Sequence, residues 1–500
     1  MMLSSLAALL ATAAVSVKAQ EGAGVSGPTT VTSGYSCNPA TCKLPACFCP
    51  STSPPGGLDP KNIPQFITLT FDDSINEVIL PQILDYTSNY VNPNGCPLAS
   101  TFYISTQYTD FWHVQRMYSM GHEIAVHTMN HVGDPPAGEI TGAVQAITTF
   151  GGVPLSKIVG FRTPFLAFTR NTYANLQAAK TFTYDSSMSV DYGAVPVWPY
   201  TLDNGAYTQC IPGTCAAPFQ FPGLWEVPMY TLNNADGSLN AAMDPEPVPG
   251  GNPGMPTANE IFELYKSNFN KRYTSTRLPM GIYLHAAVSV TQPAHITGVR
   301  MFMDWIRSSG YSDVYWVSNQ QLLAWINNPT NIADSLKNPA LDCLMPAVDK
   351  SNTEVCDGID NTGSGKIDDG LTESCYYPSL QASFTSCFGC PDTIPNVANP
   401  VPFSKPRTRT SVPAAGCPNG GTWNPVSGAC VSLVRQAKVT PTTAATTGSS
   451  SGPSTGSGSS SSSGSGTGSG KNSATTNFDL QTIAVGIASA ILAAALAFGN

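Results

Sequence analysis

Two kinds of hydrophobic pattern alternate along residues 58–343. Short runs of apolar and β-branched residues are typical of buried strands, and the stretches between them carry apolar residues every three to four positions, as on one face of a helix. The pattern predicts strands at 66–71, 99–105, 122–127, 157–161, 181–185, 224–230, 281–285 and 313–318. It predicts helices at about 75–90, 107–120, 137–151, 169–180, 257–273 and 292–309.

Strands that alternate with helices indicate a parallel sheet, because a parallel connection must cross over one face of the sheet. Seven or eight such units predict an α/β fold with a distorted (β/α)7-type barrel, closed or nearly closed. The interval 189–223 departs from the pattern, since it is rich in Pro and Gly and contains Cys210 and Cys215. Long irregular loops of this kind often shape a binding groove.

The segments outside residues 58–343 lack this periodicity. Residues 1–19 have the apolar run and small cleavage-site residues of a signal peptide, with cleavage expected before Gln20. Residues 20–57 form a Cys-rich N-terminal segment, and residues 344–440 are expected to form a Cys-rich appendage. Residues 441–471 are nearly all Ser, Gly and Thr, a composition that predicts a disordered stalk.

The last segment, 472–500, has the order of a lipid-anchor signal. Small residues beginning at Asn472 are followed by a polar spacer and by an apolar tail at 483–498. As a helix this tail would span only about 24 Å, which is short of a bilayer core of roughly 30 Å. The pattern predicts a glycosylphosphatidylinositol (GPI) anchor attached at Asn472. A C-terminal membrane helix is the alternative.

Charge and cysteine content narrow the class of protein. The net charge is −9, and only 23 Lys and Arg are spread over 500 residues. No basic stripe is available for phosphates, which argues against nucleic-acid binding. The 14 cysteines, several in tight clusters, predict disulfides in an oxidising compartment. A structural zinc cluster is the competing interpretation for the clustered cysteines.

Ionisable residues follow the predicted strands at the point where each strand ends. Because the carboxyl ends of parallel strands meet at one edge of a barrel, these side chains are expected to form one site. The residues are Asp72 and Asp73 after the first strand, His127 and His131 after the third, Arg162 after the fourth and His285 at the end of the seventh.

The spacing of His127 and His131 lets both rings converge on one metal ion. A carboxylate completes a His₂Asp set that leaves one coordination position open, as catalytic sites do. Zinc is the expected ion, with cobalt or manganese as alternatives. The other aspartate is then free to take a proton from water. Arg162 is a candidate to keep that base ionised, and His285 is a candidate general acid. A structural salt bridge and a hydrogen-bonded core histidine are the respective alternatives.

Taken together, these segments resemble one family. TFDDS, HTMNH, RTPF and YLH, in this order between about residues 60 and 330, resemble the motifs of the NodB-like polysaccharide deacetylases, carbohydrate esterase family four. CKLPACFCP, PKNIPQFITLTFDDSIN and DVYWVSNQQLLAWINNPT are similar to segments of animal-type chitin deacetylases. The resemblance implies a distorted (β/α)7 barrel that uses a divalent metal to remove acetate from N-acetylglucosamine units.

The resemblance also implies individual roles. Asp72 is the expected general base; Asp73, His127 and His131 are the expected metal ligands. Arg162 is expected to orient the base, His285 to act as general acid, and Thr128 to support the loop between the histidines. A backbone N–H near Phe165 or Leu166 is a candidate oxyanion donor.

One motif departs from the family pattern. Met188 stands where an acidic partner of the general-acid histidine is expected, which leaves Asp185, Asp191 or Asp203 as candidates. Phe165, Trp225 and Tyr230 are candidate sugar-binding residues, as are Trp198 and Trp316, although core packing is the alternative for most of these aromatics.

The appendage contains a second candidate site. In the stretch from Cys356 to Gly370, oxygen-bearing side chains follow the spacing of an EF-hand-like calcium loop, but Leu371 stands where the bidentate acid is expected. The candidate calcium ligands are Asp360, Thr362, Ser364 and Asp368. A solvated acidic turn is the alternative.

These observations predict a metal-dependent deacetylase of chitin or chitin oligomers at the cell surface or wall. It is expected to be monomeric and to reach the membrane through its lipid anchor. Two alternatives stay open: a catalytically silent chitin-binding or wall-organising protein on the same barrel, and a deacetylase of another acetylated polysaccharide.

Overall fold

The computed structural model describes residues 35–190, 197–208, 210, 213–247, 255–343, 373–380, 382–386, 390–403, 422–424 and 429–431. The chain divides into two units, Met1–Val439 and Thr440–Asn500, and the second lies outside the described residues. The expected signal peptide, stalk and lipid anchor at Asn472, and the expected calcium ligands Asp360, Thr362, Ser364 and Asp368, also lie outside them.

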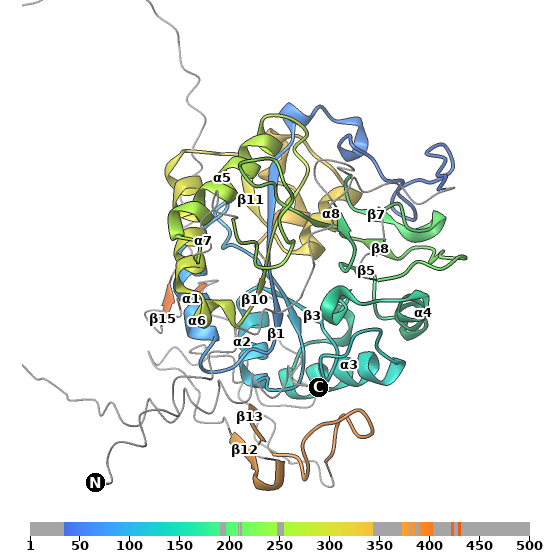
Figure 1. The fold of residues 1–500 in the computed structure, drawn as a ribbon, viewed down its shortest axis with the longest axis vertical. Coiled ribbons are helices and arrows are strands. Elements are labelled where there is room, and N and C mark those ends of the chain that lie inside the picture. The colour runs from blue at the N-terminus through green and yellow to red at the C-terminus, as the bar shows by residue number, and fades with distance from the viewer. Residues whose placement is uncertain are drawn as a thin grey trace, which may run out of the picture. The chain divides into compact units, whose positions relative to one another are not determined.

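A nine-stranded sheet forms the centre of the first unit (Figure 1), and β1 pairs with three of its strands, β10, β2 and β11. Its main path runs β10-β1-β2-β3-β4-β5-β8-β7, and only the β7–β8 pair is antiparallel among the pairs within it. The strands are β1 Gln65–Asp73, β2 Thr101–Ile104, β3 Glu123–Val126, β4 Gly160–Phe161, β5 Tyr184–Asp185, β7 Tyr200–Thr201, β8 Trp225–Glu226, β10 Met280–His285 and β11 Val314–Trp316.

Strand β11 pairs with the beginning of β1, at Gln65–Ile67, and β2 pairs with the end of β1, at Thr70–Asp73. The opposite edge of β1 pairs with β10. The sheet therefore curls without forming a regular closed ring, which confirms the predicted distorted barrel. The short pair of β6 Ser189–Val190 and β9 Met229–Tyr230 lies outside this sheet.

Helices cover the sheet on its outer side. In Figure 1, α5 and α7 lie on one side of the strands and α3 and α4 on the other. The helices are α1 Leu80–Thr87, α2 Phe111–Ser119, α3 Ala137–Gly151, α4 Arg170–Ala179, α5 Ala258–Tyr273, α6 Val288–Thr291, α7 Pro293–Ser308, α8 Asn319–Asn327 and α9 Ile332–Ser335. Helices α4, α5 and α8 each begin at a capping box, which supplies partners for the free N–H groups of their first turns.

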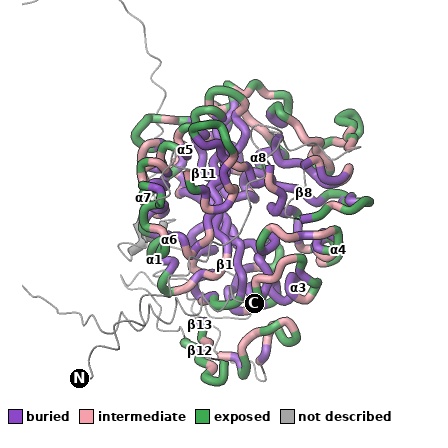
Figure 2. The backbone as a smooth tube through the Cα atoms, in the orientation of Figure 1, coloured by how far each residue is buried: buried purple, intermediate pink, exposed green. Residues whose placement is uncertain are grey.

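Burial is continuous through the strands, as the purple tube in Figure 2 shows. In β1, the side chains of Ile67, Leu69 and Phe71 join the larger hydrophobic cluster with residues of the outer helices, whereas Phe66 joins a separate cluster. Thr70 and Asp72 are on the same side of the strand as Phe66, because successive strand residues face opposite ways. This inner side carries the polar groups of the site.

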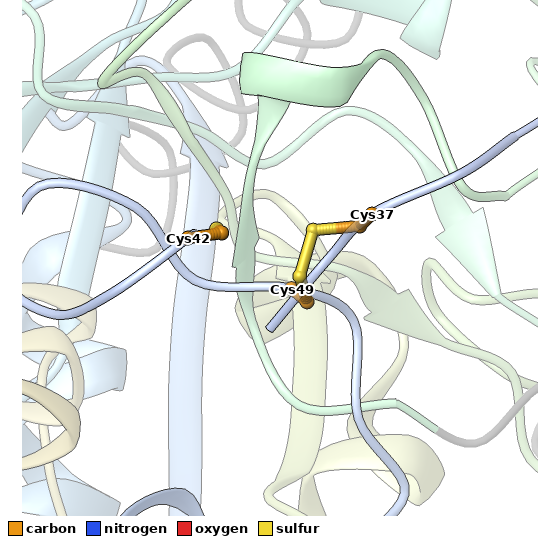
Figure 3. Close-up of side chains that lie close together, drawn as sticks. All are labelled: Cys37, Cys42 and Cys49. Atoms are coloured by element: carbon orange, nitrogen blue, oxygen red, sulfur yellow. A yellow bond between two sulfur atoms is a disulfide. The ribbon is translucent and has the colours of Figure 1, made fainter. Parts of the chain in front are cut away.

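The Cys-rich N-terminal segment lies against β7. Phe48 and Thr201 exchange hydrogen bonds, and the ring of Phe48 stacks on Trp225. Cys37 is bonded to Cys49, and Cys42 to Cys47. Figure 3 shows the Cys37–Cys49 bond with Cys42 nearby. Since these four sulfurs are consumed in disulfides, the alternative of a zinc cluster here is wrong.

Part of the Cys-rich appendage packs on the barrel. Strands β12 Glu373–Tyr377 and β13 Ala382–Ser386 form a hairpin, and a disulfide joins Cys375 to Cys390. Phe384 of the hairpin contacts Phe111 of α2 and Phe150 of α3, with ring centroids 5.4 and 5.7 Å apart. A second, separate hairpin consists of β14 Thr422–Asn424 and β15 Ala429–Val431.

Two further disulfides, Cys96–Cys343 and Cys210–Cys215, lie within residues 58–343. Among the described residues, no helix combines the length and the hydrophobicity needed to cross a bilayer.

Candidate active site

The predicted site residues meet at the carboxyl edge of four strands of the sheet. Asp72 and Asp73 end β1, His127 directly follows β3, Arg162 follows β4, and His285 ends β10. In the sheet order, β10 pairs with β1, so that Asp72 and His285 are direct neighbours across the strands. His131 lies in the loop after β3. The N–H groups of Thr106 and Gln107, in the loop after β2, donate to the carbonyl oxygens of Thr128 and Met129 in that loop.

Both aspartates reach His127 because the backbone changes conformation between them. Asp73 has φ 81°, in the left-handed region that a non-glycine residue seldom adopts. This conformation ends the strand alternation, which would otherwise turn adjacent side chains to opposite faces. His127 Nε2 lies 3.9 Å from Asp72 Oδ2 and 3.7 Å from Asp73 Oδ1.

Asp73, His127 and His131 form a set that fits a metal ion. One ligand atom of each lies within 4.8 Å of the others, and His131 Nε2 is 3.2 Å from Asp73 Oδ1. Ligand atoms that share a tetrahedral ion at about 2.1 Å lie roughly 3.4 Å apart, which matches this spacing. Among the described residues, Asp73 Oδ1 and His131 Nε2 are buried without a hydrogen-bond partner, which fits atoms that coordinate a metal ion.

A backbone contact prepares His127 for this role. Its Nδ1 lies 2.8 Å from the carbonyl oxygen of Arg162, to which it donates a hydrogen bond. The bond fixes the tautomer in which Nε2 carries a free lone pair directed at the site. Burial also lowers the pKa of His127 to about 3, so that the ring is neutral, as a metal ligand must be.

The loop between the two histidines has an unusual backbone. Thr128 and His131 have φ 70° and 55°. The Thr128 hydroxyl accepts a hydrogen bond from the N–H of Val132 at 3.2 Å, a contact that supports the expected structural role of Thr128. Sequence reasoning did not identify Glu139, whose carboxylate accepts hydrogen bonds from this loop.

Asp72 is held by a buried arginine. Arg162 Nη1 donates to Asp72 Oδ1 at 2.6 Å and to Thr70 Oγ1 at 3.0 Å. Its Nε and Nη2 donate to the carbonyl and hydroxyl oxygens of Ser186, and its guanidinium lies over the ring of Tyr103, 4.0 Å from the centroid. The arginine is thus fixed on every side and can present its charge to Asp72 without further ordering.

Two opposing effects set the protonation of Asp72. Burial raises its pKa to about 6, because the charged form loses its hydration, and the charge of Arg162 limits this rise. A carboxylate with a pKa near 6 is a stronger base than an exposed aspartate and is still ionised at neutral pH. These are the properties that a general base requires.

His285 faces Asp72 from β10 and has a partner of its own. Its Nδ1 forms a short hydrogen bond with Asp244 Oδ2, and its backbone N–H donates to Asp244 Oδ1 at 2.9 Å. The expected partners Asp185 and Asp203 are therefore wrong: Asp185 bonds to Tyr173 and Ser187, and Asp203 accepts from a backbone N–H. The third candidate, Asp191, lies outside the described residues.

Asp244 could not be found by motif spacing, since it lies in an irregular segment far from the motifs. The nearby backbone explains its position: Met243 bridges to Tyr283 of β10, and the N–H of Asp244 donates to the carbonyl oxygen of Tyr283. Met188, in the place expected for the acid, is fully buried, and its sulfur accepts hydrogen bonds from Tyr200 and Thr208.

The candidate sugar-binding aromatics divide into two groups. Phe165 is 42 % exposed, has φ 57° and packs its ring edge-on against His131, with centroids 4.5 Å apart. It therefore offers an apolar surface directly beside the candidate metal ligands. The N–H of Leu166, one of the expected oxyanion donors, is already bonded to the carbonyl oxygen of Thr163.

Trp225 and Tyr230 differ from the expectation. They are 6 % and 2 % exposed; Trp225 stacks on Phe48, and the Tyr230 hydroxyl donates to the carbonyl oxygen of Val197. Both side chains are core residues and present no surface for a sugar, and Trp198 and Trp316 are similarly buried.

Comparison with known proteins identifies the family of the chain. The family model described as polysaccharide deacetylase matches residues 59–185. Chitin deacetylase 8 of Bombyx mori is 30 % identical over 382 residues, which cover 73 % of this chain and 93 % of that protein. The chain belongs to the polysaccharide deacetylase family. The predicted membership and the predicted deacetylase class of hydrolase are thereby confirmed.

Other relatives of this polysaccharide deacetylase are more distant. Chitin deacetylase 1 of Bombyx mori is 29 % identical over 317 residues, 60 % of this chain and 58 % of that protein. A chitin deacetylase from the fungal pathogen Colletotrichum lindemuthianum aligns with 14 % identity and a TM-score of 0.28, over 52 % of this chain and 88 % of that structure. A family 4 acetyl xylan esterase from Clostridium thermocellum aligns with 16 % identity and a TM-score of 0.31, over 54 % and 95 %.

Proposed function

We propose that this protein hydrolyses the N-acetyl groups of chitin or chitin oligosaccharides, releasing acetate and leaving chitosan. The observation that carries the proposal is the joint placement of three functions at one strand edge: a metal-ligand set, a base held by a buried arginine, and a histidine with its own carboxylate. Family membership and the similarity to two chitin deacetylases support the choice of substrate. The complete set of functional groups argues against the catalytically silent alternative.

Asp73, His127 and His131 are the proposed ligands of a divalent ion. Zinc suits two nitrogens and one carboxylate oxygen, and cobalt or manganese are accepted by the same ligands. When bound, such an ion would supply Lewis-acid polarisation of the acetyl carbonyl group. The side chains of Asp73 and His131 are 27 % and 20 % exposed, so the set is open on the side from which substrate approaches.

The other residues carry out or support the proton transfers of the reaction. Asp72 takes a proton from the attacking water molecule, and Arg162 keeps Asp72 ionised until that step. His285 donates a proton to the departing nitrogen, which is needed because an amine anion is a poor leaving group. Asp244 bonds Nδ1 of His285, which orients the ring so that Nε2 can face the substrate. Phe165 is the proposed contact for a sugar ring beside the metal set.

We also propose where the protein acts. The disulfides of the described part indicate an oxidising compartment. Together with the expected signal peptide at 1–19 and the expected GPI signal beginning at Asn472, they support a secreted enzyme held at the cell surface or cell wall. The proposed oligomeric state is a monomer.

Acetate release from chitin oligosaccharides tests the proposed activity. Purified protein should release acetate, lose this activity after treatment with a chelator, and regain it when Zn²⁺ or Co²⁺ is added. Acetylated xylan and peptidoglycan fragments serve as the comparison substrates. Faster release from either would replace chitin as the substrate, and no release from any of them would contradict the enzymatic proposal.

A further inference from the structure

Glu139 lies at the third position of α3 and is 6 % exposed. An acid in the first turn of a helix is ordinarily explained by its interaction with the helix dipole. Here the carboxylate is turned toward the loop between His127 and His131. Its Oε2 accepts from the backbone N–H groups of Met129 at 3.0 Å and Asn130 at 2.9 Å, and its Oε1 accepts from Asn130 Nδ2 at 2.8 Å.

This loop needs support from outside. Thr128 and His131 both adopt left-handed backbone conformations, which are strained for residues other than glycine. Thr128 is also β-branched, for which this conformation is especially unfavourable. The loop's own Thr128–Val132 hydrogen bond is one neutral contact at 3.2 Å, whereas Glu139 supplies three charge-assisted ones. The carboxylate therefore stabilises the backbone that sets His131 opposite His127.

We propose that Glu139 is a positioning residue of the metal site. By fixing the loop before an ion binds, it holds Nε2 of His131 close to Asp73 Oδ1, so that binding requires little reordering of the ligands. Glu139 itself touches neither the ion's ligand atoms nor the substrate. The inference rests on the proposed metal site but is separable from it, since it concerns affinity for the ion.

The test compares Zn²⁺ binding by wild type and Glu139→Ala, measured by competition with a chromophoric chelator. The expected result is a dissociation constant raised about 10- to 100-fold, as is typical when a residue that orders metal ligands is lost. Glu260→Ala is the matched control, because Glu260 occupies the same position in α5 and, within the described part of the chain, its carboxylate bonds to its own cap residue, Thr257. It should leave Zn²⁺ affinity unchanged.

Excess Zn²⁺ should also restore the activity that Glu139→Ala loses. At saturating Zn²⁺, Glu139→Ala should regain most of the wild-type kcat, because Asp72 and His285 are intact. Glu139→Gln keeps the shape and one acceptor but loses the charge, so it should fold if the alanine variant does not. Its Zn²⁺ affinity is expected to fall roughly fivefold, the equivalent of about one hydrogen bond.

Three outcomes would overturn the inference. Unchanged Zn²⁺ affinity in both Glu139 variants, with affinity present in wild type, removes the positioning role alone. Equal loss of affinity in Glu260→Ala assigns the effect to general helix stability. A wild-type protein that binds no Zn²⁺ overturns the proposed metal site and this role together.

Discussion

The backbone of Asp73 determines what the two neighbouring carboxylates can do. Its left-handed conformation brings both carboxylates to His127, yet their surroundings differ: Asp72 is 3 % exposed and bonded to Arg162, whereas Asp73 lies against both histidines. Two identical side chains, adjacent in sequence, thereby acquire different roles from their environments.

Substitution separates these roles. Asp72→Asn should keep bound metal and lose at least about 10²-fold in kcat, because it removes the base and leaves the ligands. Asp73→Ala should lose the metal together with activity. In wild type, the rate should fall as pH drops through about 6, where Asp72 takes up a proton. Metal content of the purified variants and a pH–rate profile provide the measurements; a metal-free Asp72→Asn would reverse the assignment.

Substrates with different leaving groups test the proposed roles of His285 and Asp244. His285→Ala should slow amide hydrolysis strongly but slow hydrolysis of an activated aryl acetate much less, because a phenolate leaves without a proton. Asp244→Asn should show the same selectivity to a smaller extent, since the His285 ring loses its charged partner but is itself still present. Equal losses on both substrates would mean that the pair is structural and that the acid lies elsewhere.

Some residue-level features could be predicted and others could not. Hydrophobic pattern and motif order were enough to place the residues that lie at or shortly after strand ends: Asp72, Asp73, His127, His131, Arg162 and His285. Asp244 lies in an irregular segment, and only the tertiary contact of that segment with β10 brings it to His285. Glu139 could not be predicted for a different reason. An acid in the first turn of a helix is ordinarily explained by its interaction with the helix dipole.

At the scale of elements, the sequence predicted strands and helices well where their periodicity was long. The expected helices at 137–151 and 257–273 correspond to α3 and α5 within one residue. The expected strand at 224–230 is instead β8 and β9, in two different sheets, and Val227 and Pro228 between them belong to neither strand. Periodicity over so few residues cannot reveal which neighbour a strand will pair with.

Strands β5 and β8 carry two buried carboxyl groups that affect how the free energy of unfolding depends on pH. Asp185 and Glu226 share the Tyr173 hydroxyl, and burial raises the pKa of both. A folded-state pKa above the unfolded value favours folding at low pH, and this contribution declines as pH rises above the ordinary value of 4.5 for Glu. The decline has a limiting slope of about 1.4 kcal/mol per pH unit for one group.

Glu226→Gln should therefore flatten the dependence of stability on pH, because its amide resembles the protonated carboxyl and does not titrate. Above pH 4.5, the variant should lose less of its unfolding free energy than wild type does. Denaturant unfolding at several pH values is the measurement. Parallel curves for the two proteins would show that Glu226 does not titrate in this range.

At the scale of the whole molecule, the appendage and the C-terminal segments should differ in importance. A chain that ends at Val439 should keep its deacetylase activity, because every proposed site residue lies in the unit Met1–Val439. A chain that ends at Cys343 should be less stable, because Phe111 and Phe150 lose their contacts with Phe384. Melting temperatures of both truncated proteins test this difference.

Treatment of the intact, cell-bound protein with a phospholipase specific for GPI lipids completes that test. Release into the medium is expected from the predicted anchor at Asn472. Retention on the membrane would favour the alternative of a C-terminal membrane helix.

The Cys96–Cys343 disulfide closes a loop with a sequence separation of 247 residues, and every proposed catalytic residue except Asp72 and Asp73 lies within it. A protease that cuts this loop, for instance beside Met255, which is 74 % exposed, would leave both fragments in one covalent molecule. The nicked enzyme should migrate as an intact chain in a non-reducing gel and separate into two bands only after reduction. In a medium rich in secreted proteases, a single cut would then leave β1 tethered to the rest of its active site.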